Sequence, residues 1–134
     1  MEFGAAVFNP VSSSAINQIW ICGGADVNNN QLAEAWYTND GATWTQSVPP
    51  WEARDRCNLV ALNDKLYLLG GINNFTVLTE MWVMDANGQW TQSPDRMPYD
   101  QKALNYWGIA TGVFKWRAWL VINSIDRPLF FYNP

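Results

Sequence analysis

The chain has 134 residues, of which 15% are charged and 15% aromatic, and nine are tryptophan. Its net charge of −4 gives no basic surface for nucleic acid or an anionic membrane, and no apolar run reaches the length of about 18 residues that predicts a membrane span. Without histidine, the sequence excludes Ser-His-Asp triads and ordinary zinc or copper sites. We therefore expect one modest domain, or a piece of a larger one, with no metal and no cofactor.

The first predicted unit spans about residues 3–47 and contains four short strands. The apolar run 19–22 is closed by a glycine pair, and a run of this length is too short for a helix but fits a buried strand that turns at its end. Two further strands carry Trp36 and Trp44 and flank an Asn-Asp-Gly turn. The asparagine-rich stretch between the second and third strands is typical of an exposed loop.

The second unit spans about residues 54–93 and repeats the first. The segment LAEAW recurs as LTEMW, and WTQS recurs unchanged, both displaced by 46 residues. Hairpin turns are predicted at Asn63-Asp64 and at Ala86-Asn87-Gly88, because asparagine, aspartate and glycine accept the backbone angles of tight turns. Four short antiparallel strands repeating at about 40 to 50 residues are typical of propeller blades.

The third unit, about residues 105–134, departs from the pattern. GIATGV, WRAWLVI and PLFFYN predict its first three strands, but Asn123-Ser124 stands where the other units have a glycine pair, and no tryptophan-bearing fourth strand follows. The fold class is therefore all-β, with about two and a half to three four-stranded antiparallel blades.

The repeated unit resembles the kelch-repeat β-propellers, with the closest match over residues 4–93. In that family the glycines allow tight backbone packing and the tryptophans fill the space between blades. The residues that carry this resemblance, and that it implies are structural, are Gly23, Gly24, Trp36, Trp44, Gly70, Gly71, Trp82 and Trp90. Because propellers use about four to eight blades, the resemblance implies that other protein, from a longer polypeptide or from other subunits, completes the ring.

A second resemblance concerns the segment TNDGATW, residues 38–44, which is similar to the Asp-box turn of sialidase-like propellers. The box is a folding device, so we interpret Asp40 as a turn cap and not as a catalytic residue. Cys22 and Cys57 fit either a disulfide or two buried thiols, and we favour buried thiols.

Seven residues in predicted loops are candidates for binding: Trp51, Arg54, Arg56, Asn74, Phe75, Tyr106 and Trp107. Arg54 and Arg56 fit two roles equally, a ligand contact near the mouth of a central channel, as the kelch resemblance implies, or a solvated charge cluster with Glu52 and Asp55. Trp51, Tyr106 and Trp107 fit stacking on a sugar or anchoring a protein, but packing against the next blade is favoured.

Asn74-Phe75-Thr76 forms an N-glycosylation sequon on a predicted loop. The sequon, the Asp-box-like turn and the tryptophan content together favour an extracellular or lumenal protein over a cytoplasmic adaptor.

Two functions follow as hypotheses. The favoured one is a non-catalytic protein-interaction or structural module, because a propeller is a rigid frame whose loops present a binding surface and the polar residues form no catalytic constellation. The alternative is an extracellular propeller that binds or processes carbohydrate.

Overall fold

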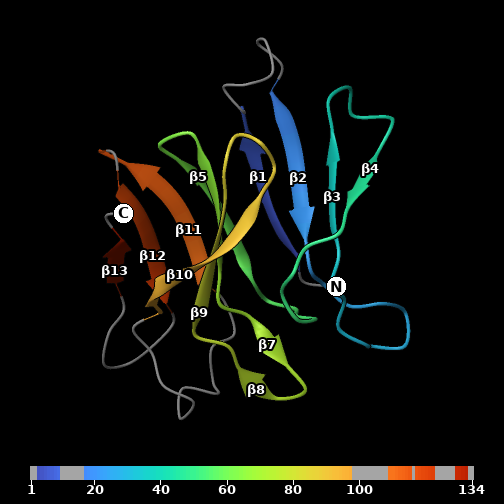
Figure 1. The fold of residues 1–134 in the computed structure, drawn as a ribbon. Helices are drawn as coiled ribbons and strands as arrows, with labels where there is room; N and C mark the ends of the chain where they lie inside the picture. Colours follow the sequence, from blue (N-terminus) through green and yellow to red (C-terminus); the bar gives the residue numbers. More distant parts are fainter. Residues whose placement is uncertain (1–2, 10–16, 98–108, 116, 123–128, 133–134) are drawn as a thin grey trace.

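The structure is a computed structural model, and it describes residues 3–9, 17–97, 109–115, 117–122 and 129–132. These residues are all-β: every strand pair is antiparallel and none of the residues is helical (Figure 1). Correspondingly, this part of the chain has no helix that could span a membrane. The predicted all-β class with four-stranded antiparallel sheets is confirmed.

Sheet 1 is the first unit of the sequence, with its four strands in chain order: β1 (Gly4–Phe8), β2 (Gln18–Cys22), β3 (Ala35–Thr38) and β4 (Thr45–Ser47). The glycine pair after β2 has φ values of 68° and 101°, which side-chain-bearing residues rarely adopt, so the chain turns there as expected. Trp44 lies just before β4 rather than within it.

Sheet 2 is the second unit, with the order β10-β9-β6-β5: β5 (Asn58–Leu62), β6 (Lys65–Leu69), β9 (Glu80–Met84) and β10 (Trp90–Arg96). Asn63 and Asp64 have φ values of 52° and 58°, which suits the tight hairpin predicted there. At the other hairpin only Gly88 has a positive φ, because the β9–β10 turn closes over five residues, from Asp85 to Gln89. The predicted loop between β6 and β9 contains a further hairpin, β7 (Ile72–Asn73) and β8 (Thr76–Val77).

Sheet 3 is three-stranded and confirms the three strands predicted for the third unit: β11 (Ile109–Phe114), β12 (Arg117–Ile122) and β13 (Leu129–Tyr132). Residues 105–108 and Asn123-Ser124, which were assigned to the same unit, lie outside the described residues.

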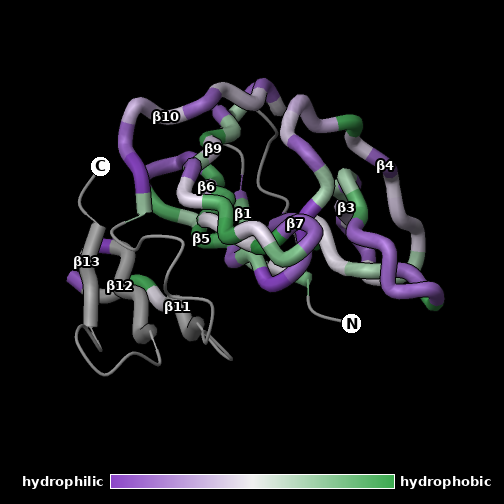
Figure 2. Tube along the Cα trace, turned by 90° about the horizontal axis from the view of Figure 1, so that it is seen from below, coloured by the Kyte–Doolittle hydropathy of each residue, from purple (hydrophilic) through white to green (hydrophobic). Residues whose placement is uncertain are grey.

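The three sheets meet along their first strands. β5 contacts β1 on one side and β11 on the other, while β4 and β10 form the opposite edges of sheets 1 and 2 (Figures 1 and 2). The contact between β1 and β5 is close because Gly4 has no side chain: a Cβ there would lie 3.1 Å from the Cys57 carbonyl oxygen and the Leu59 nitrogen.

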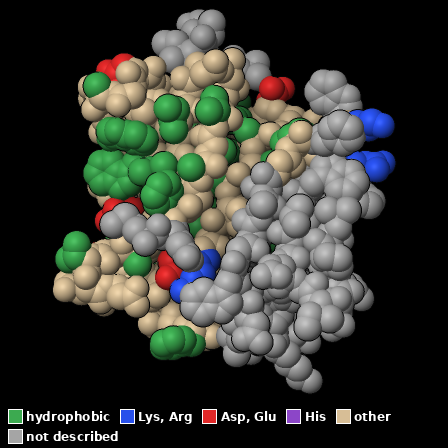
Figure 3. All heavy atoms as spheres, turned by 180° about the vertical axis from the view of Figure 1, so that it is seen from behind, with side chains coloured by type: hydrophobic (Ala, Val, Ile, Leu, Met, Phe, Trp, Pro, Cys, Tyr) green, Lys and Arg blue, Asp and Glu red, His purple; other side chains and the backbone are tan. Residues whose placement is uncertain are grey.

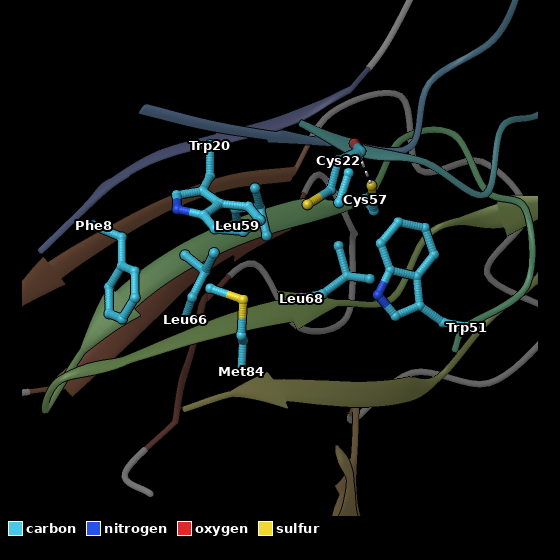
Figure 4. Packing of buried hydrophobic residues seen from close by; sticks show 10 residues of the cluster. Phe8, Trp20, Cys22, Trp51, Cys57, Leu59, Leu66, Leu68 and Met84 are labelled. Atoms are coloured by element: carbon cyan, nitrogen blue, oxygen red, sulfur yellow. Dashed lines mark hydrogen bonds between the residues drawn. The ribbon is translucent and has the colours of Figure 1, made fainter. Parts of the chain in front are cut away.

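Sheet 2 is buried on both faces of β5, β6 and β9, because these strands contain continuous apolar runs that place large side chains on each side. One core cluster lies between sheets 1 and 2, as Figure 4 shows, and consists of Phe8, Trp20, Cys22, Ala35, Trp51, Cys57, Leu59, Leu66, Leu68 and Met84. The cluster on the other face consists of Val60, Leu62, Tyr67, Leu69, Val77, Met81 and Met97.

Candidate functional site

The segment that links sheets 1 and 2 carries three of the candidate residues, and Arg54 is its centre. The Arg54 side chain is fully buried, with 0% exposed surface. Its Nη1 donates to the Gly70 carbonyl at 2.9 Å, its Nη2 to Glu80 Oε1 at 2.5 Å and its Nε to the Glu52 carbonyl at 3.1 Å. The guanidinium carbon also lies 5.5 Å from the ring centre of Trp51, a cation–π arrangement. A buried charge of this kind requires such partners.

The Arg54 backbone attaches the same residue to sheet 1. Its N–H donates to the Leu32 carbonyl at 3.1 Å, and its carbonyl accepts from the Gly24 N–H at 2.8 Å. A Cβ on Gly23 would lie 2.5 Å from the Arg54 carbonyl oxygen, and one on Gly71 would lie 2.9 Å from that of Asp55. The glycine pairs therefore allow the linker to run directly against the end of each sheet.

These contacts correct the interpretation of Arg54 as part of a solvated charge cluster with Glu52 and Asp55. The carboxylate partner is Glu80, on a strand 26 residues further along the chain, which local sequence does not indicate. Burial alone raises the pKa of Glu80, but the hydrogen bonds from Arg54 and Trp82 outweigh it and lower the pKa below its ordinary value. Because Arg54 is enclosed, its surface is not presented to a ligand in this structure.

Arg56 and Trp51 complete the linker. Arg56 is half-buried and has a left-handed backbone, with φ of 53°. Trp51 is 3% exposed and takes the packing role: its ring meets Trp90 edge to face, with centroids 6.2 Å apart. Tyr106 and Trp107, two further aromatic candidates, lie outside the described residues.

Cys22 and Cys57 are free thiols in the core between the sheets, which decides between the two alternatives left open by the sequence. The Cys57 thiol donates to the Cys22 carbonyl at 3.4 Å (Figure 4). Burial raises the pKa of both, in the case of Cys57 to about 11, so both remain neutral and weakly nucleophilic at physiological pH.

Asn74 and Phe75 form the tip of the β7–β8 hairpin, apart from the linker's buried centre. Both are exposed and left-handed, with φ values of 46° and 65°, and the Phe75 side chain is 91% exposed. The sequon therefore lies on an accessible turn. The hairpin contacts the linker through Asn73, whose Nδ2 donates to Glu52 Oε2 at 3.2 Å.

A shallow groove that the sequence did not indicate opens between the two sheets, near the β9–β10 turn. It encloses about 230 Å³. Trp20 and Tyr37 stack in its wall with centroids 4.8 Å apart, and Trp20 Nε1 donates to Gln18 Oε1 at 2.9 Å. The residues that line it are Phe8, Gln18, Trp20, Tyr37, Ser47, Met84, Asp85, Ala86, Asn87 and Gly88. The repeat gave no signal for this groove, because neither Gln18 nor Tyr37 recurs in the second unit.

Asp40 caps the β3–β4 turn, as predicted. Its Oδ1 accepts from the backbone N–H groups of Ala42 at 2.9 Å and Thr43 at 2.7 Å. These hydrogen bonds, together with one from Thr38, lower the pKa of Asp40 to about 2. The Asp40 carboxylate is thus used by the turn.

Among the described residues, no group of three or more His, Cys, Asp or Glu side chains could hold a metal ion.

No protein-family model matches the chain, and no curated protein matches it either. Among solved structures, that of YjhT superimposes on 90% of this chain with a TM-score of 0.64 and 17% sequence identity. The chain spans about a third, 33%, of the length of YjhT. At this identity the likeness concerns the fold alone.

Proposed function

We propose that the chain contributes consecutive blades to a kelch-type β-propeller and acts there as a non-catalytic structural and protein-binding module. The observation that carries the proposal is the convergence of the sheets on their first strands, with β5 between β1 and β11 and with β4 and β10 at the opposite edges. Blades arranged around a central axis have this geometry. The partial superposition on YjhT supports it as a matter of fold.

The buried linker supports the structural part of the proposal. Arg54 joins the end of sheet 1 to the end of sheet 2, and its guanidinium is used entirely within the protein. The two thiols are enclosed and the Asp40 carboxylate is held by a turn. Each of these polar groups therefore has a structural role in the frame.

Distances between spin labels test this arrangement. Labels on Asn9 and Lys65 lie near the first strands, and labels on Thr45 and Thr91 lie on the fourth strands; all four residues are exposed. We expect a clearly shorter distance for the first pair than for the second, because blades diverge outward. Equal distances would indicate two stacked sheets of a sandwich and would contradict the proposal.

Carbohydrate binding is the second candidate, and the groove beside Tyr37 is the observation that favours it. Its stacked aromatic wall and its neighbouring amide and carboxylate groups, from Gln18, Asn87 and Asp85, are of the kinds that hold sugars. A glycan array separates the candidates. Glycan binding that is lost in Tyr37→Ala but kept in Phe75→Ala would favour the carbohydrate function, whereas the absence of glycan binding is expected for the protein-binding module.

A further inference from the structure

Sheets 1 and 2 can be compared position by position, because their strands pair in the same register. Trp36 lies opposite Ile21 in sheet 1, and Trp82 lies opposite Leu68 in sheet 2. Each tryptophan also donates its indole N–H to the glutamate two residues before it, at 3.0 Å in sheet 1 and 3.3 Å in sheet 2. The row of sheet 1 that contains Ile21 and Trp36 is therefore equivalent to the row of sheet 2 that contains Leu68 and Trp82.

The two equivalent faces differ in what covers them. In sheet 2 this face packs against sheet 1, and both Leu66 and Leu68 are 0% exposed. In sheet 1 it is the outer face, where Ile19, the equivalent of Leu66, is 44% exposed and its neighbour Val7 is 61% exposed. Trp44, just before β4, is 38% exposed, whereas its equivalent Trp90 is partly buried and packs against the core.

Apolar side chains form a patch on this side of the molecule, over sheet 1 (Figure 3). Val7 and Ile19 lie opposite each other on adjacent strands of this face. Trp20 and Cys22 alternate with Ile19 and Ile21 along β2 and lie on the opposite face, against sheet 2. We define the outer face as Val7, Ile19, Ile21 and Trp36.

We propose that the outer face of sheet 1 binds a second copy of this chain, head to tail, through the side of the copy's sheet 3 that faces away from sheet 2. The chain itself shows the mode of packing, since sheet 1 covers the equivalent face of sheet 2 within one molecule. This inference rests on the proposed propeller arrangement, in which each blade is covered by the one before it.

Sheet 3 has the sequence that such a contact needs. In the sequence, residues 119–122 of β12 and 129–132 of β13 are continuous apolar runs. Such runs are typical of strands in a sheet that is covered on both faces. Val113 on β11 is 49% exposed. The head-to-tail contact joins two different surfaces, so each added copy leaves one surface open for the next. Copies therefore add in one direction until the rotation between them closes a ring.

The mass of the chain in solution tests the proposal. Light scattering and sedimentation at micromolar concentration should give a multiple of 15.3 kDa, the mass of one chain. Ile19→Lys places an unpaired charge on the outer face and should weaken the association by about 100-fold or more. Because Ile19 is already 44% exposed, this variant should keep its circular dichroism spectrum. Val27→Lys is the control: Val27 is 94% exposed on the β2–β3 loop, and its substitution should leave the mass unchanged.

Cross-linking identifies the two surfaces. A Val7→Cys chain mixed with a Val113→Cys chain should give mixed dimers with a short bis-maleimide, whereas Val27→Cys mixed with Val113→Cys should not. Cys22 and Cys57 are buried and should not react. A wild-type monomer, or an assembly insensitive to Ile19→Lys, would overturn the proposal. In either case the spin-label distances decide separately whether the propeller arrangement stands.

Discussion

The outer face of sheet 1 and the inner face of sheet 2 are built from equivalent positions of one repeat, yet one is solvent-exposed and the other is core. Leu66 has no exposed surface, whereas Ile19 is 44% exposed. The two positions are equivalent, because each lies two residues before the residue that pairs with a repeated tryptophan on the neighbouring strand. The difference teaches that burial in a repeat protein is set by the neighbouring repeat and not by the position within the repeat.

The same comparison extends to the charged residues. Glu80 accepts hydrogen bonds from both Trp82 and the buried Arg54, which belongs to the linker between sheets 1 and 2. Its equivalent Glu34 accepts from Trp36, and no cation of the described residues forms an ion pair with it. A segment that covers the outer face would thus also meet a carboxylate without its counterion.

Removing the arginine should have the largest effect on stability. Arg54→Met leaves Glu80 without its cation and the Gly70 carbonyl without its donor, so we expect a loss of about 3 to 5 kcal/mol in the free energy of unfolding. Urea unfolding measures this. Lys65→Met removes an exposed charge and should change stability by less than about 0.5 kcal/mol. Equal effects would show that Arg54 is not the junction between the sheets.

Truncation at the two equivalent apolar positions tests the comparison directly. Leu66→Ala opens a cavity in the core and should cost about 3 kcal/mol, whereas Ile19→Ala should cost less than about 1 kcal/mol in the monomer. The difference should be largest in dilute protein, where association does not cover Ile19. A cost for Ile19→Ala that matches Leu66→Ala at every concentration would mean that the outer face is covered within a single chain.

The glycine pairs offer a test of the close approach between linker and sheets. Gly23→Ala and Gly41→Ala impose similar strain, because their φ values are 68° and 77°. Only the first new Cβ meets other atoms, at 2.5 Å from the Arg54 carbonyl oxygen, while nothing lies within 4 Å of the second. We expect losses of about 2 to 3 kcal/mol for Gly23→Ala and about 1 kcal/mol for Gly41→Ala. Thermal unfolding of the two variants side by side gives the comparison.

Much of this fold could be predicted from the sequence, since the relevant signals are local. The glycine pairs, the Asn63-Asp64 turn and the short apolar runs each act within a few residues, and the strands follow them closely. The β7–β8 hairpin was missed because two-residue strands carry too little periodicity to separate from a loop.

The candidate site could be predicted less well, because its contacts are between distant segments. Arg54 and Glu80 are 26 residues apart, and the groove joins β2 and β3 to a turn in the other sheet. The sequence does contain one relevant signal. Glu34 and Glu80 occupy the same position of the repeat, two residues before a tryptophan, which indicates that the repeat requires a glutamate there. Which side of a strand is buried, however, depends on the neighbouring sheet. The sequence of the strand alone does not determine it.

The smallest effect we predict concerns acid and separates Glu80 from the other carboxylates. The folded-state pKa of Glu80 is lowered from 4.5, so the unfolded chain takes up the proton first as the pH falls. The stability that Glu80 contributes is therefore fully present above about pH 4.5 and is lost as the pH falls through the folded-state pKa. In urea unfolding between pH 6 and pH 3, Glu80→Gln should show a shallower decline than the wild type. In an Arg54→Met background the same substitution should change the slope little, because the arginine supplies the main hydrogen bond to the carboxylate. Parallel curves for wild type and Glu80→Gln would mean that the ion pair does not form in solution.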